Sequence, residues 1–333
     1  MCGAVTIVVT GGAGFIGSHA CKALAAAGYR PVVVDNLSTG HAEAVRWGPL
    51  HRVDLRDEAA LGAVLAAERP RAVLHFAAAA YVGESVSDPA FYYDNNVVGM
   101  ICLLTACRTF GVDRVILSSS CATYGQPAQM PIREDTPQEP INPYGRTKLM
   151  CEQILRDHGA AFGLRFVSLR YFNAAGADPE GVLVENHDPE THLIPLALMA
   201  ASGRRPPLRV FGTDYPTPDG TCVRDYIHVT DLATAHVAAL RYLLDGGGSD
   251  AFNLGTGRGY SILEIADEIG RLFGRPLPWQ PAARRPGDPP VLVADTARAA
   301  RVLGVRPQHS DITSILRDAG PAFGLSARAT ADA

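Results

Sequence analysis

Lysine is nearly absent from this chain of 333 residues, which contains only Lys22 and Lys148 among its 30 basic residues. The formal net charge is −4, so the arginines are outweighed by acidic residues. Proteins that bind nucleic acids or anionic membranes usually carry a clear excess of positive charge. We therefore expect neither nucleic acid nor membrane as a partner.

Regular cysteine and histidine motifs are also missing. The seven cysteines include no Cys-x-x-Cys pair, and the histidines form no cluster in the sequence. This pattern predicts reduced thiols in a cytoplasmic protein, without a disulfide framework, and it predicts no metal site. Apolar runs stay well below the roughly 18–20 residues of a membrane-spanning helix.

A glycine-rich turn follows the first apolar segment of the chain. The β-branched run Val5–Thr10 predicts a buried parallel strand, and it leads directly into Gly11, Gly14 and Gly17. Glycines at this spacing allow a tight strand-to-helix turn, and the following helix N-terminus can bind a pyrophosphate. A second predicted strand ends at Asp35, where an acid would bind ribose hydroxyls and repel a 2′-phosphate. The pattern predicts a dinucleotide site that prefers NAD to NADP.

Strand and helix patterns then alternate as far as Phe172. Repeated βα units predict an α/β fold, a doubly wound parallel Rossmann sheet with strand order 3-2-1-4-5-6. Ligands of such sheets bind at the carboxyl ends of the strands. The predicted strands are 5–10, 31–35, 51–55, 72–76, 112–118 and 165–172, and the predicted helices are 18–27, 58–68, 89–110 and 143–162.

Three serines, Ser118, Ser119 and Ser120, lie at the end of the fifth predicted strand. Serines in this position are often no more than the start of a loop. Here they border the expected cofactor crevice, and a serine hydroxyl can hydrogen-bond a substrate hydroxyl during proton transfer. We predict that one of the three is functional.

Tyr144 and Lys148 are four residues apart in a predicted helix, so they share one face. A phenol with its usual pKa near 10 is a poor base at neutral pH, and an adjacent ammonium group would lower that pKa. With 11 tyrosines in 333 residues, a given lysine has a tyrosine at this spacing about one time in thirty. The pair is a candidate proton-transfer device, although a surface tyrosine beside a solvated lysine would look the same.

After Phe172 the elements become shorter, and proline, glycine and charged loops become more frequent. We predict an NAD-binding Rossmann domain over 1–172, completed by segments near 224–254, and a second, smaller α+β substrate domain over 173–333. The turn Arg284-Arg285-Pro286-Gly287-Asp288 offers guanidinium groups for a diphosphate and a carboxylate for ribose hydroxyls.

Eight segments in order resemble the UDP-glucose 4-epimerase family of extended short-chain dehydrogenase/reductases. They are TGGAGFIG, HFAAAAYVGES, YYDNNVVG, SSSCATYG, NPYGRTK, LRYFNAAG, FGTDYPTPDGTCVRDYIHVTDLA and RRPGD, and the resemblance as a whole runs from near residue 5 to about residue 320. The resemblance implies that Tyr144 is the catalytic base, that Lys148 assists it and holds the nicotinamide ribose, and that Ser120 bonds the sugar 4-hydroxyl.

The same resemblance implies two further sets of binding residues. The NAD site would comprise Gly11, Gly14, Phe15, Ile16, Gly17, Asp35, Asn36, Asp54, Leu55, Phe76, Ala77, Ala78, Asn95, Ser118, Tyr144, Lys148 and Phe172. The UDP-sugar site would comprise Ser120, Tyr144, Asn173, Leu193, Arg224, Arg285, Asp288 and Leu292. Helices 89–110 and 143–162 would form a homodimer interface.

The implied reaction interconverts UDP-glucose and UDP-galactose through a 4-keto sugar and bound NAD. Ala80 replaces the lysine of well-known members, and the surrounding segments also resemble UDP-xylose/UDP-arabinose 4-epimerases. Leu292 is smaller than the tyrosine of strict members, which leaves UDP-N-acetylhexosamines open. A UDP-sugar reductase is a less favoured alternative, and a redox-sensing binding protein is disfavoured because it would not need Ser120, Tyr144 and Lys148 together. A 4,6-dehydratase is disfavoured because Cys121-Ala122-Thr123 replaces its acid–base pair.

Overall fold

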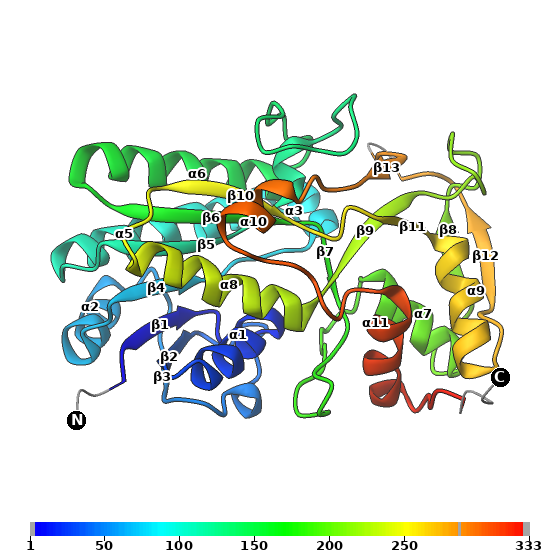
Figure 1. Cartoon of the computed structure of the whole chain (residues 1–333), viewed down its shortest axis with the longest axis horizontal. Coiled ribbons are helices and arrows are strands. Elements are labelled where there is room, and N and C mark those ends of the chain that lie inside the picture. The colour runs from blue at the N-terminus through cyan, green and yellow to red at the C-terminus, as the bar shows by residue number, and fades with distance from the viewer. Residues whose placement is uncertain (1–3, 286–287, 329–333) are drawn as a thin grey trace.

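Seven parallel strands form the central sheet of the larger part of the molecule (Figure 1). The computed structural model describes residues 4–285 and 288–328. The strand order β10-β6-β5-β4-β1-β2-β3 contains the predicted order 3-2-1-4-5-6, with β10 added beside β6. The strands are β1 (Thr6–Thr10), β2 (Arg30–Asp35), β3 (Leu50–Arg52), β4 (Ala72–His75), β5 (Arg114–Ser120), β6 (Arg165–Tyr171) and β10 (Asp250–Leu254).

Helices cover both faces of this sheet, as the doubly wound prediction requires (Figure 1). Successive strand residues point to opposite faces, so Ile7 and Val9 enter one apolar core while Val8 enters the other. Helices α1 and α8 pack on the first face, and α2, α5 and α6 pack on the second. Their bounds are α1 (Phe15–Ala26), α2 (Glu58–Glu68), α5 (Gly99–Thr109), α6 (Pro143–Phe162) and α8 (Val229–Leu244).

Several predicted boundaries are wrong. The first helix begins at Phe15 rather than at residue 18, because the glycine turn is shorter than expected. Strand β5 continues to Ser120 because the serines pair in register with β6. The predicted helix 89–110 is interrupted by a π-helical stretch, Tyr93–Val98, between α4 (Pro89–Tyr92) and α5, and α3 (Val82–Ser87) precedes it.

The rest of the chain builds a smaller α+β part around its own apolar core (Figure 1). One small sheet has the order β11-β9-β13, with β7 also paired to β9, and β8 pairs with β12. These strands are β7 (Asn173–Ala175), β8 (Leu208–Phe211), β9 (Val223–His228), β11 (Gly259–Ser261), β12 (Trp279–Ala282) and β13 (Val291–Leu292). Helices α7 (Leu193–Ala201), α9 (Ile262–Phe273) and α11 (Ile312–Ala319) pack around this core, whereas α10 (Ala297–Val302) packs with the larger core.

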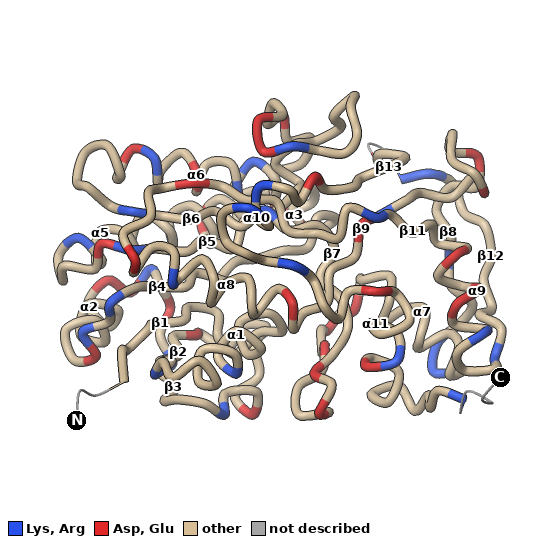
Figure 2. The backbone as a smooth tube through the Cα atoms, viewed as in Figure 1, with Lys and Arg blue, Asp and Glu red and all other residues tan. Residues whose placement is uncertain are grey.

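Charged residues of both signs are distributed over both parts of the molecule (Figure 2). The long loop between β7 and α7 differs, because residues 176–192 contain five acidic residues and neither lysine nor arginine. Within 4–285 and 288–328, none of the helices is both long enough and apolar enough to cross a bilayer.

Candidate active site

The glycine turn after β1 is pressed against the loop that follows β4. Gly11 has a φ of +72°, and a methyl group added to it would lie 2.4 Å from the amide nitrogen of Ala77. A methyl group at Gly17 would lie 2.2 Å from the carbonyl oxygen of Gly11. Both positions therefore need glycine to let the backbone segments approach each other.

Gly14 has no such structural requirement. Its φ of −83° suits any residue, and a methyl group there would meet only the Gly11 carbonyl oxygen, at 3.4 Å. Gly14 is also the N-cap of α1, and no side chain caps this end of the helix. The turn thus leaves backbone N–H groups and open space at a helix N-terminus, which is the arrangement that binds a pyrophosphate.

Asp35 is fixed at the end of β2 by two backbone amides. Its carboxylate accepts hydrogen bonds from Ala13 at 3.0 Å and from Leu37 at 2.8 Å. Asp35 therefore borders the glycine turn, as the dinucleotide prediction requires. Asn36 donates to Asp54 at 3.0 Å, and the adjacent Arg56 holds the pKa of the Asp54 carboxyl well below its usual range.

An asparagine outside the predicted set organises the loop after β4. Asn96 accepts from the Ala79 amide at 2.8 Å and donates to the Ala79 carbonyl and to Thr147 of α6, both at 3.0 Å. The predicted residue Asn95 donates to the Asn96 side chain at 3.0 Å. Asn96 is buried, and a buried asparagine in a helical segment needs hydrogen-bond partners. The pair Asn95-Asn96 within a predicted helix was therefore the sequence signal that could have identified Asn96.

This loop contains more of the predicted cofactor residues. Phe76, Ala77 and Ala78 are partly exposed there, as are Phe15 and Ile16 at the start of α1. Leu55 and Phe172 are buried, and each joins an apolar core beside the strand ends.

The three serines at the end of β5 have different surroundings. The carbonyl oxygen of Ser118 accepts from Lys148 at 2.8 Å, and its hydroxyl contacts the Tyr171 hydroxyl. Ser119 donates to the buried carboxylate of Glu152 at 2.6 Å. The Ser120 hydroxyl lies beside the Tyr144 phenol and accepts from the Ala122 amide at 3.1 Å.

The structure thus separates the serines by role. Ser119 belongs to a buried network in which Glu152 also accepts from both Nε and Nη2 of Arg170, at 2.9 and 2.6 Å. Of the three hydroxyls, only that of Ser120 interacts with Tyr144 in the described residues. The geometry favours Ser120 as the serine that can take part in proton transfer.

The lowering of the Tyr144 pKa by Lys148 stays a prediction, because burial is the largest influence on this phenol among the described residues. Burial raises the pKa of Tyr144 to about 12, and the Ser120 interaction only partly offsets this rise. Lys148 Nζ is 5.9 Å from the centre of the Tyr144 ring and donates instead to the Ser118 carbonyl. Burial lowers the pKa of the Lys148 ammonium to about 8.

Lys148 still fits a cofactor contact. Its buried ammonium group has three N–H donors but makes one hydrogen bond within the described part of the chain. Donors that remain available can bind ribose hydroxyls. Together with the open space at Gly14 and the uncapped start of α1, this lysine shows that the residues present fit a dinucleotide.

The substrate residues predicted from the second half come from neighbouring strands and turns. Asn173 on β7 donates to the Asp225 carbonyl of β9 at 2.9 Å. Leu292 on β13 is in register with Arg224 on β9, and it packs near Phe172. Leu193 begins α7 and is partly buried against the smaller core.

The charged residues of this region are paired within the protein. Arg224 forms an ion pair with Asp288, and the Arg285 guanidinium lies 4.0 Å from the centre of the Phe211 ring. The separate diphosphate and ribose roles expected for Arg224 and Asp288 would require this ion pair to rearrange or to be shared with a ligand. Pro286 and Gly287 of the predicted turn lie outside the described residues.

Comparisons with known proteins agree with this geometry. Residues 7–255 match the model of the NAD dependent epimerase/dehydratase family. The chain belongs to this family. It is 58% identical over 313 residues to a UDP-glucose 4-epimerase of Rhizobium meliloti, covering 94% of this chain and 95% of that protein.

Solved epimerase structures superpose over nearly the whole chain of this family member. A UDP-glucose 4-epimerase from Brucella ovis in complex with NAD is 60% identical, with a TM-score of 0.96, and the match covers 98% and 100% of the two chains. An enzyme from Stenotrophomonas maltophila with bound NAD and formylated UDP-arabinopyranose is 41% identical, with a TM-score of 0.93 and coverage of 96% and 98%.

Proposed function

We propose that this protein is an NAD-dependent isomerase that interconverts UDP-glucose and UDP-galactose. The observation that carries the proposal is the meeting of Ser120, Tyr144 and Lys148 at the carboxyl end of β5, next to a glycine turn that fits a dinucleotide. The 58% identical relative named UDP-glucose 4-epimerase supports the same activity.

NAD, held by the glycine turn, Asp35 and Lys148, would supply the acceptor for a hydride from C4 of the sugar and the donor that returns it to the opposite face. The Tyr144 phenolate takes the proton of the 4-hydroxyl and gives it back after the sugar has turned over. Ser120, beside the phenol, holds the reacting hydroxyl. Burial raises the pKa of Tyr144 to about 12, so the phenolate needs positive charge nearby, and Lys148, with its Nζ 5.9 Å from the centre of the Tyr144 ring, is the buried cation that would supply it.

Several residues of the second half would hold the substrate in this mechanism. Guanidinium groups match diphosphate oxygens, so Arg224 and Arg285 would anchor the UDP while the sugar rotates. Arg224 would contact both Asp288 and the uridine end of the ligand. The set is completed by Asn173, Leu193 and Leu292.

The domain division that suits this function follows the two apolar cores. Residues 1–172, with the returning segments near 224–254, would bind NAD, and residues 173–333 would bind the UDP-sugar. Helix α8 and strand β10 pack with the larger core, which supports the interleaved arrangement.

We also propose a cytoplasmic homodimer. The six cysteines in the described residues are all free thiols, in keeping with a reducing compartment. Phe91, Val98 and Ile101 on the predicted 89–110 helix and Met150 on α6 are 38–45% exposed, so these two helices offer apolar side chains to a second subunit.

The substrate is tested by incubating the purified protein separately with UDP-glucose, UDP-xylose and UDP-N-acetylglucosamine and resolving the C4 epimers. We expect UDP-glucose to be converted fastest, without consumption of added NADH. Faster conversion of the pentose or the N-acetylhexosamine would reassign the sugar. NADH consumed in proportion to product would identify a reductase, and no epimer from any substrate would refute the proposal.

A further inference from the structure

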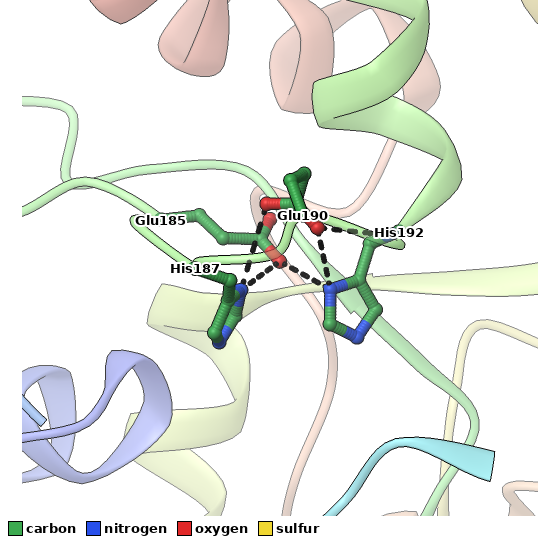
Figure 3. A group of neighbouring side chains, drawn as sticks. All are labelled: Glu185, His187, Glu190 and His192. Atoms are coloured by element: carbon green, nitrogen blue, oxygen red, sulfur yellow. Dashed lines mark hydrogen bonds and ion pairs between the residues drawn. The ribbon is translucent and has the colours of Figure 1, made fainter. Parts of the chain in front are cut away.

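The acidic loop between β7 and α7 brings together four side chains that no step of the proposed reaction uses. They form what we term the Glu/His cluster: Glu185, His187, Glu190 and His192 (Figure 3). One ligand atom from each residue lies within 4.8 Å of all the others. We propose that the Glu/His cluster binds one divalent transition-metal ion of the Zn²⁺ type.

The distances within the cluster suit a tetrahedral ion. His187 Nδ1 is 3.2 Å from Glu185 and 3.6 Å from Glu190, and His192 Nδ1 is 3.1 Å and 3.0 Å from the same two carboxylates. Ligands about 2.0–2.1 Å from a tetrahedral Zn²⁺ are separated from one another by about 3.3 Å. The four printed nitrogen–oxygen distances are close to this separation, and the remaining pairs of donor atoms, which lie within 4.8 Å of each other, would have to draw together around an ion.

One nitrogen of the cluster lacks a satisfactory partner. His187 Nδ1 is buried, and although the carboxylates are near, the contacts do not have hydrogen-bonding geometry. In Figure 3 this nitrogen faces the two carboxylates from one side, while His192 Nδ1 faces them from the other. A metal ion between the rings would satisfy both nitrogens.

The charge of the surroundings also favours a cation. The side chains of Glu185 and Glu190 are only 5% and 4% exposed, and two buried carboxylates within 4.8 Å of each other require compensating positive charge. The whole loop 176–192 contains neither lysine nor arginine, and Lys22 of α1 is already paired with Asp178 and Glu180. Compensation must come from two protonated imidazoles or from a metal ion.

The ligand types select the class of metal. Two imidazoles with two carboxylates suit Zn²⁺ and neighbouring transition metals, whereas Mg²⁺ and Ca²⁺ prefer oxygen ligands alone. Aromatic rings enclose the site: the Phe15 and Tyr81 rings each lie 6.2 Å from the His187 ring. An ion here would fasten the loop between the start of α1 and the start of α7, so its role would be structural, beside the predicted binding residues Phe15 and Leu193.

The test is titration of untagged, chelator-treated full-length protein with ZnCl₂ in a calorimeter, with CoCl₂ and MgCl₂ in parallel. We expect one Zn²⁺ per chain, the visible spectrum of tetrahedral Co²⁺, no Mg²⁺ binding, and a higher melting temperature with Zn²⁺. Absence of stoichiometric Zn²⁺ binding would overturn the proposal and leave two protonated histidines as the compensating charge. Equal binding of Mg²⁺ would overturn the class of metal.

Two variants assign the ion to this cluster. His187→Asn and Glu185→Gln should each weaken Zn²⁺ binding by more than about 100-fold, beyond the range typical of outer-shell residues. The matched control is His51→Asn, because His51 also contacts a glutamate, Glu68 at 3.0 Å, but has no second histidine. Unchanged Zn²⁺ affinity in both cluster variants, or an equal loss in the control, would place the ion elsewhere. Should a variant fail to fold, the Co²⁺ spectrum of the unaltered protein still decides whether nitrogen–oxygen ligands bind the ion.

Discussion

At the scale of single residues, Tyr144 bears most of the proposed chemistry. Tyr144→Phe removes the hydroxyl that takes and returns the proton, while the ring continues to fill its place beside Ser120. Because general acid–base groups contribute about 100-fold to 10,000-fold, we expect kcat to fall by that range. Steady-state assay with UDP-glucose measures the change. Bound NAD and the melting temperature should be unaltered, and activity within a few-fold of the unaltered protein would exclude Tyr144 as the base.

Two glycines of the same turn should respond oppositely to one added methyl group. In Gly14→Ala the methyl has room in the protein, so we expect nearly unchanged stability but weaker NAD binding. In Gly17→Ala it would lie 2.2 Å from a backbone oxygen, and such overpacking should cost about 1–3 kcal/mol of unfolding free energy. Denaturant titration and NAD calorimetry separate the two effects. Equal NAD affinity in Gly14→Ala and the unaltered protein would contradict a pyrophosphate at Gly14.

Lys148 gives the protein stripped of nucleotide a defined pH dependence. Burial lowers its pKa from 10.5 to about 8, so between these values the unfolded chain binds a proton that the folded protein does not. The contribution of Lys148 to unfolding free energy therefore rises with pH in this window, by up to about 1.4 kcal/mol per pH unit.

Lys148→Met removes that titration and retains the size of the side chain. The stability of the variant relative to the unaltered protein should therefore fall as the pH is raised from about 8 toward 10. Urea titrations at several pH values measure this difference. A difference that does not vary with pH would show that Lys148 keeps its usual pKa.

At the scale of elements, α6 is fastened to the sheet by one buried carboxylate. Burial would raise the pKa of Glu152, but hydrogen bonds and charge from Arg170 outweigh this and lower it. Glu152→Gln leaves the Arg170 charge without its buried partner, and we expect a loss of about 3–5 kcal/mol in unfolding free energy. Arg156→Gln is the control, since Arg156 contacts the same carboxylate from the surface and should cost less than about 1 kcal/mol. Similar losses in both would contradict the assigned importance of the buried pair.

The sequence predicted the bounds of a helix correctly where residues at its two ends mark them. Helices 58–68 and 143–162 have their predicted bounds, because N-caps Asp57 and Asn142 and helix-ending residues Arg69 and Gly163 mark both ends locally. The predicted strand 112–118 ends two residues before β5 does, because the last residues of β5 are serines, whose place in the sheet depends on pairing with β6, a contact that is distant in sequence.

The candidate site shows the same division. The Tyr144–Lys148 pair could be chosen from its spacing, and Ser120 from the family resemblance. Three other contacts join segments that are distant in the sequence, so the sequence did not reveal them. Ser119 binds Glu152, Arg224 pairs with Asp288, and Asn96 binds the Ala79 backbone. The Glu/His cluster depends on how one loop folds back on itself. A polar segment without hydrophobic periodicity does not predict such a conformation.

At the scale of the whole molecule, the proposed dimer can be tested through one exposed side chain. Ile101 is 45% exposed on α5, and Ile101→Glu would place a charge in the proposed interface. We expect the unaltered protein to sediment as a dimer and the variant as a monomer. Val302→Glu, at a 38% exposed valine on α10, should remain dimeric. A monomeric unaltered protein, or equal dissociation of both variants, would contradict the interface.

The proposed reaction requires hydride to leave C4 and to return to the same carbon within one molecule. The most direct measurement is incubation of the purified protein in ordinary water with UDP-glucose deuterated at C4, followed by mass and NMR analysis of the sugar. We predict UDP-galactose that keeps its deuterium at C4, formed without added NADH. No UDP-galactose, or UDP-galactose with hydrogen at C4, would contradict the proposed mechanism.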